Sequence, residues 1–345
     1  MKKKSLLFAL IAVIGCMPLH AADSLSAVLP LLEAQTRTAA QNHQVLNLFA
    51  TSKDASTIFA SGASLVRIPP AKSYEAKLFN IILKNDNMLK KVFAAVIIVA
   101  MGGEHHELSP LLKDATASED HALRAYAAAA YTILNPDQTD YKEDIINLYI
   151  YDSAFAQRAM NLISADENQT FKYLKSAAKS SNAQVRGAVA AWLGDLQTKN
   201  AAKQLLKMAK GELSQEVINA IAMSLAKNEQ WTLQETAKGL KTRYTHQSAT
   251  AYALALGFMT GNAVEPIKQA LLSQDINQRV NAARAAAYMA AVLASPQADQ
   301  YTLDKDFDIT LLKGLIPTLS AMTKHDESSV KVYADNALKQ ISKLM

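Results

Sequence analysis

The 345-residue sequence contains little glycine, proline, cysteine or aromatic side chain. Its 11 Gly and 9 Pro are roughly half of average usage, which excludes a collagen-like repeat and argues against a turn-rich β-sandwich. Half of the residues are hydrophobic, which excludes a disordered chain of low hydrophobicity. The remaining composition, rich in alanine and leucine, is typical of closely packed helices.

The motifs of common catalytic and nucleotide-binding sites are also absent. The sequence has no G-x-S-x-G, no G-x-G-x-x-G, no phosphate-binding loop and no H-E-x-x-H. The single cysteine, Cys16, lies in the N-terminal segment, so we expect neither a disulfide framework nor a catalytic thiol in the mature protein. The sequence therefore predicts a protein that is not an enzyme and that uses no cofactor.

The N-terminus has the pattern of a secretory signal peptide. Lysines at positions 2, 3 and 4 precede an apolar run, 6–14, which is too short to span a membrane permanently. Removing these three lysines from the 36 basic residues leaves 33 against 31 acidic ones, a net charge of +2. Such a small excess gives no support to nucleic-acid binding. We assign residues 1–21 to a signal peptide and predict a periplasmic protein.

The cleavage site of this signal peptide has two interpretations. Cleavage after Ala21 would release a soluble protein that begins near Ala22. Alternatively, the segment 13–16 resembles a bacterial lipobox, although Val13 departs from the usual leucine. Acylation of Cys16 would then produce a structural lipoprotein anchored to the envelope membrane, and only in this case do we expect contact with a membrane.

The rest of the chain divides into three parts. Residues 22–60 have the apolar periodicity of one or two amphipathic helices, and residues 61–73, with Gly62 and Pro69-Pro70, predict a linker. From residue 74 to the C-terminus a repeat is present. In its three clearest copies a proline precedes a basic residue by 13 or 14 positions: Pro110 and Arg124, Pro266 and Arg279, Pro317 and Lys331.

Each copy predicts a helix that carries the proline, a short turn, and a second helix that begins just before the basic residue. The three clear copies and weaker ones between them place the anchors at positions 90, 124, 157, 186, 218, 250, 279 and 331. The last spacing is longer than the others and indicates an insertion near 294–308. We expect the charged positions to cap helices and to bridge adjacent repeats as a structural ladder: Asp120, Arg124, Arg186, Asp275, Arg279 and Lys331.

This pattern resembles the HEAT repeat family, especially its short HEAT-like branch of the phycobilisome-lyase type, where D-x-x-x-R opens the second helix. The resemblance covers about 270 residues and implies an all-α fold, a right-handed α-solenoid of about eight helix pairs with an N-terminal helical cap. An irregular all-α domain is the alternative. The resemblance favours a non-catalytic binding or scaffolding protein of the bacterial cell envelope that presents a concave helical surface to a protein partner.

Two segments are weak metal-binding candidates, and they carry the alternative of a metal-dependent enzyme or enzyme accessory. The turn at 104–107 contains His105 and His106, but neighbouring histidines lack the i, i+4 spacing of helical zinc ligands. The second segment contains Asp304, Asp306 and Asp308. It lacks the glycine and the glutamate of a calcium-binding loop, so we expect Asp308 to cap the next helix and predict no metal.

Four tyrosines form the candidate binding surface. Advancing 100° per residue from each anchor places the second and ninth following positions away from the alanine pair that faces neighbouring helices. Tyr126, Tyr252, Tyr333 and Tyr288 occupy these positions. The pattern predicts a discontinuous stripe of tyrosines for a protein partner, the alternative being rings packed against their own neighbours. Both tryptophans, at positions 192 and 231, are interpreted as packing residues.

Overall fold

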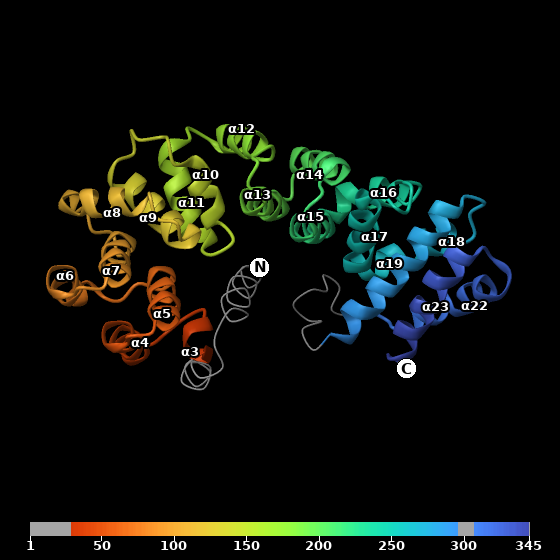
Figure 1. Ribbon diagram of the computed structural model, residues 1–345, viewed down its shortest axis with the longest axis horizontal. Helices are drawn as coiled ribbons and strands as arrows, with labels where there is room; N and C mark the ends of the chain where they lie inside the picture. The colour runs from red at the N-terminus through yellow and green to blue at the C-terminus, as the bar shows by residue number, and fades with distance from the viewer. Residues whose placement is uncertain (1–28, 296–306, 345) are drawn as a thin grey trace. The chain divides into compact units, whose positions relative to one another are not determined.

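The computed structural model of the protein describes residues 29–295 and 307–344 (Figure 1). All regular elements in these ranges are helices, which confirms the predicted all-α class. The chain divides between Tyr173 and Leu174 into two compact units, so the predicted array of residues 74–345 is shared between them. The signal segment with Cys16, and Asp304 and Asp306 of the predicted insertion, lie outside the described residues.

The first unit contains four helix pairs after a short initial helix. Its elements are α3 (Leu29–Glu33), α4 (Ala39–Thr51), α5 (Ala55–Arg67), η1 (Lys72–Tyr74), α6 (Glu75–Lys84), α7 (Met88–Ala100), η2 (His106–Leu108), α8 (Ser109–Ala115), α9 (His121–Leu134), α10 (Lys142–Leu148) and α11 (Ser153–Ile163). Helix α12 (Glu167–Ala177) contains the division between the units. Within each pair we call the earlier helix the first helix and the later one the second helix.

The second unit continues the same alternation. Its elements are α13 (Ala183–Leu196), α14 (Lys199–Gly211), α15 (Gln215–Lys227), α16 (Glu229–Gly239), α17 (Gln247–Met259), η3 (Thr260–Ala263), α18 (Val264–Leu271), α19 (Ile276–Ala294), α21 (Thr310–Lys313), α22 (Ile316–His325) and α23 (Ser328–Ser342). Helices α13, α15, α17, α19 and α23 pack in this order, each against the next, and α14, α16, α18 and α22 pack against their own partners (Figure 1).

The predicted repeat anchors coincide with the second helices. All eight anchors fall on the third, fourth or fifth residue of α7, α9, α11, α13, α15, α17, α19 or α23. Asp120 and Asp275 accept hydrogen bonds from backbone N–H groups of the first turns of α9 and α19. Pro110 and Pro317 lie at the start of α8 and α22, where a missing N–H costs nothing. Local chemistry therefore begins the helices where the repeat predicts them.

The predicted linker 61–73 is wrong over its first half. Helix α5 continues through Arg67, and only the segment from Ile68 to Ala71 is irregular before η1. Gly62 lies within α5 against Phe93 of α7, and a Cβ atom at Gly62 would lie 2.6 Å from the Phe93 ring. This glycine therefore serves close packing between helices and does not make a turn. Helices α4 and α5 form a further helix pair ahead of the predicted repeats.

In the first unit, second helices contribute one aromatic ring each to a common centre. Phe59 of α5 lies 5.1 Å from Phe93 and 6.2 Å from Tyr126 of α9, measured between ring centroids. Phe155 of α11 stacks on Tyr126 at 6.5 Å. Helix α11 also returns to contact α5. The four second helices of this unit therefore enclose an aromatic core between them.

In the second unit, α17 and α19 cross at a glycine. A Cβ atom at Gly257 would lie 2.8 Å from Cβ of Tyr288 and 3.0 Å from the backbone nitrogen of Met289. Because this neighbour is backbone, a side-chain rotation cannot relieve the overlap. The two helices approach as closely as they do because Gly257 has no side chain.

We expect Gly257→Ala to lower the free energy of unfolding by about 1–3 kcal/mol, because α19 must move away from α17. Gly187→Ala is the matched control, since a Cβ atom at this α13 position would have nothing within 4 Å. It should leave stability unchanged or raise it by up to about 1 kcal/mol through helix propensity. Urea titrations of both variants measure this, and equal effects at the two sites would contradict the close crossing.

Candidate functional site

The predicted tyrosine stripe is not present as such, because Tyr126 and Tyr252 are buried. Tyr126 is 1% exposed inside the aromatic core of the first unit, and burial raises the pKa of its hydroxyl well above the usual value. Tyr252 is 4% exposed and its ring contacts Gly239 of α16, where a larger residue would overlap it. Both residues pack inside the fold, so the prediction that Tyr126 and Tyr252 contact a partner is wrong.

The other two tyrosines are half-buried in the second unit. Tyr333 of α23 lies under the Arg284 guanidinium, 5.6 Å from its ring centroid, and its ring is 6.4 Å from that of Tyr244. Tyr288 lies where α19 crosses Gly257. The positions opposite the alanine pair are not free surface, because the second helices are packed on more than one side. Helices α9, α17 and α19 each contact their first helix and the second helices before and after them, and α23 contacts α22 and α19.

The arginines of the predicted ladder connect turns of successive helix pairs. Arg186 donates Nε and Nη2 to the two carboxylate oxygens of Glu212, each at 2.8 Å, and Nη1 to Ser180 and Ser181 carbonyls. Arg279 binds Asp326 in the same two-fold way, at 2.8 and 2.7 Å. These arginines are structural, because every guanidinium nitrogen is directed to another part of the fold.

Arg124 makes the equivalent contact in the first unit, with Nε 2.9 Å from Asp144. Arg124 and Arg279 do not pair with the aspartates four positions before them, because those carboxylates cap the helices instead. Burial raises the pKa of Asp326, but the hydrogen bonds and charge of Arg279 outweigh it and lower the pKa. The charge of Lys331 adds a smaller effect in the same direction. The acidic partners of the ladder lie in the next helix pair and were not predicted.

The histidine turn lies between α7 and η2 and forms a small charged cluster. His105 Nδ1 is 2.9 Å from Glu107, and His105 Nε2 hydrogen-bonds Glu75 at the start of α6. Burial lowers the pKa of His105, but the hydrogen bonds with Glu107 and Glu75 outweigh it and raise the pKa. His106 opens η2 beside this cluster. Among the described residues, this cluster is not arranged to hold a metal ion.

Asp308 lies just before α21 and accepts the backbone N–H of Thr310 at 2.9 Å. Hydrogen bonds from Thr310 lower the pKa of its exposed carboxyl group. Across residues 29–295 and 307–344, no group of three or more His, Cys, Asp or Glu side chains is arranged to hold a metal ion. The described part of the acidic segment therefore acts as a helix cap.

A second polar cluster is buried in the first unit around Arg67 and Asp152. Asp152 is 3% exposed, and its Oδ1 caps α11 by accepting the Phe155 N–H at 3.0 Å. Among the described residues, Asp152 Oδ2 and Arg67 Nε have no hydrogen-bond partner. Burial raises the pKa of Asp152 to about 6, with the backbone N–H of Phe155 and the charge of Arg67 acting against it.

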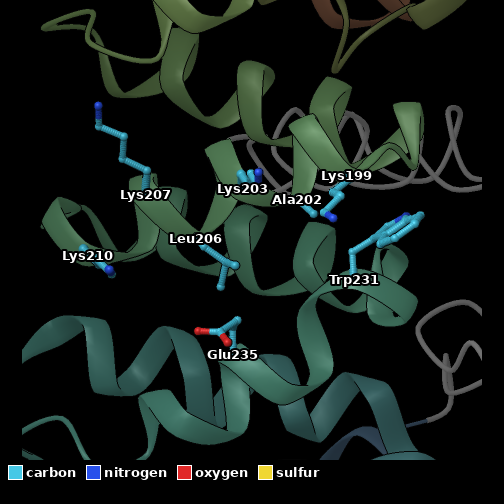
Figure 2. A pocket seen from close by; sticks show the side chains of 8 residues that line it. All are labelled: Lys199, Ala202, Lys203, Leu206, Lys207, Lys210, Trp231 and Glu235. Carbon is cyan, nitrogen blue, oxygen red and sulfur yellow. The ribbon is translucent and has the colours of Figure 1, made fainter.

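A surface groove in the second unit, between the first helices α14 and α16, is the strongest candidate site. We call it the lysine groove; its volume is about 460 Å³ and its lining residues are Lys199, Ala202, Lys203, Leu206, Lys207, Lys210, Trp231 and Glu235. The lysines follow one side of α14 and the last two residues project from α16 (Figure 2). Basic side chains thus line one side of an apolar floor.

The wall from α16 is amphipathic. Trp231 is 45% exposed, and the Lys199 ammonium group lies 6.0 Å from its ring centroid. Glu235 is bound to Lys238 of its own helix at 2.7 Å. A neighbouring groove of about 380 Å³ lies on the α13 side of α14 and shares Lys207 with the lysine groove. Helix α14 therefore presents lysines to two adjoining depressions.

The interpretation of both tryptophans as packing residues is correct only for Trp192, which is 2% exposed. The sequence contains a signal for the lysine groove, namely lysines at positions 199, 203, 207 and 210. Spacings of three and four residues place side chains on one face of a helix. The segment 199–211 has no acidic residue to neutralise them. The position of Trp231 beside them depends on the packing of α14 against α16.

The comparisons with known proteins yield little. No protein-family model and no curated protein matches the sequence. Among solved structures, an engineered protein determined by crystallography matches 87% of this chain and 96% of its own, with 18% identity and a TM-score of 0.21. So low a score supports no conclusion about fold or function. In the described ranges no helix has the length and apolar character to cross a membrane.

Proposed function

We propose that this protein is a non-catalytic binding protein of the bacterial cell envelope that captures a protein partner. Its helix pairs are proposed to be HEAT-like repeats of a right-handed α-solenoid, supported by the anchors near the start of eight successive second helices. Residues 1–21 are proposed to direct the chain to the periplasm, with acylation of Cys16 as the alternative.

The lysine groove is the observation that carries this function. An exposed tryptophan beside an apolar floor is unusual on a surface that stays in water, and aromatic anchors of this kind dominate protein interfaces. The groove lies on first helices, and its lysines and Trp231 are accessible, unlike Tyr126 and Tyr252. The proposed binding surface therefore moves from the second helices to α14 and α16.

Site-specific crosslinking in cells tests this proposal. Replacing Lys203 by the photoreactive residue p-benzoylphenylalanine should give a discrete adduct with one envelope protein upon irradiation. The same replacement at Asn336, an exposed position of α23, is the control and should give none. We expect Lys207→Glu combined with Lys210→Glu to reduce the Lys203 adduct several-fold. Absence of an adduct, or an identical adduct from both positions, would refute a binding function of the groove.

A further inference from the structure

We infer that the lysine groove recognises an acidic amphipathic helical segment of the partner protein. This inference rests on the proposed binding function and specifies the chemistry that the groove takes. Its support comes from the charge, the apolar floor and the single acidic residue of the groove.

The basic side of the groove has unneutralised charge. No carboxylate among the described residues forms an ion pair with Lys203, Lys207 or Lys210. From Lys199 to Lys210 the lysines span three turns of α14, which is about 16 Å at 1.5 Å per residue. A partner helix with carboxylates at i, i+4 and i+8 repeats this spacing along its own length. Charge complementarity therefore favours an acidic segment.

The apolar floor beside the lysines requires the partner segment to carry apolar groups as well. Ala202 is buried beneath the groove, Leu206 is half-exposed, and Trp231 presents nearly half of its surface. Amphipathic helices place apolar side chains every three or four residues into such grooves. The aliphatic stems of the lysines extend this apolar surface while their ammonium groups stay at the rim. A purely charged ligand would leave the floor and Trp231 unused.

Glu235 argues against a uniform polyanion such as a nucleic acid or a sulfated glycan. Its carboxylate lines the wall opposite the lysines and is paired with Lys238, so this wall offers an ion pair where a continuous row of phosphate or sulfate groups would need positive charge. Single-stranded nucleic acids are bound by several aromatic platforms in succession, and this groove has one aromatic ring. A helix with one acidic face satisfies the lysines without placing charge against Glu235.

The test uses the full-length mature protein and a synthetic helical peptide of about 16 residues. The peptide carries Glu at i, i+4, i+8 and i+11 with Leu on the adjacent stripe, and a matched peptide has Gln in place of each Glu. We expect the Glu peptide to bind at least tenfold more tightly than the Gln peptide, less tightly as salt is raised, and to change Trp231 fluorescence. Trp231→Ala should weaken binding about tenfold or more.

Charge reversal provides the matched control. Lys203→Glu with Lys207→Glu should abolish binding of the Glu peptide and create binding of a Lys-substituted peptide. Changing the exposed Lys339 of α23 and the exposed Lys343 just after it to Glu should change neither. Circular dichroism confirms that each variant is folded. Equal binding of the Glu and Gln peptides, or tighter binding of heparin than of the Glu peptide, would overturn the inference. A peptide bound in vitro without a crosslinked partner in cells would instead refute the proposed function alone.

Discussion

Replacing Glu212 by alanine should lower the free energy of unfolding of the second unit by about 2–4 kcal/mol. Burial alone raises the pKa of this carboxyl group, but Arg186 and the N–H groups of Ser214 and Leu213 outweigh burial and lower it. The variant leaves the Arg186 guanidinium without its carboxylate partner, and two backbone N–H groups lose their acceptor. Urea unfolding followed by tryptophan fluorescence measures the loss, since both tryptophans lie in the second unit.

Glu216→Ala is the matched control for this variant. Glu216 is exposed in the first turn of α15, so its removal changes the net charge equally but costs at most about 1 kcal/mol of helix-dipole interaction. Similar small losses in both variants would show that the two-fold Arg186–Glu212 contact adds nothing beyond a surface charge. A large loss at Glu212 alone would establish the ladder as a main link between successive helix pairs.

The stability of the first unit should depend on pH through Asp152. Its pKa is about 6 in the folded protein and 3.8 in its ordinary environment, so the folded state binds the proton more tightly. The resulting stabilisation is complete below about pH 4 and is lost as the pH rises through 6. A shift of this size corresponds to at most about 3 kcal/mol.

Asp152→Asn isolates this contribution, because asparagine keeps the oxygen that caps α11 but does not titrate. We expect the wild-type-minus-variant difference in unfolding free energy to fall between pH 4 and pH 7, with most of the change between 4 and 6. Hydrogen exchange of α9 and α11 amides reports on this unit, which contains no tryptophan. A difference that stays constant over this range would mean that Asp152 is ionised throughout, held by Arg67.

The acidic-to-basic repeat illustrates how far sequence reasoning reaches. Asp120 and Asp275 were identified because capping is local, within three residues along the chain. The partner of Arg279, by contrast, is Asp326, which lies 47 residues away across the segment that lengthens this repeat. No helical spacing connects these two side chains. Only the packing of α19 against α23, which also packs against α22, brings them together.

Glycine shows the same division between local and tertiary information. Gly62 followed by a pair of prolines has the local pattern of a turn, yet it lies in α5. A glycine fits there because Phe93 of another helix occupies the space beside it. Gly102, with φ of +87°, lies in the turn after α7, in a backbone conformation that favours glycine. The two roles differ in what surrounds the residue, and that surrounding comes from helices distant in the chain.

The sequence by itself determined the all-helical class and the start of the second helices from α7 onward, because caps, prolines and apolar periodicity act over a few residues. Tertiary structure decided which surfaces stay accessible. Tyr126 is enclosed because α11 returns to α5, whereas Trp231 is exposed because it lies at the edge between α14 and α16. Exposure is a property of all helices that surround a residue, so a calculation on one helix cannot supply it.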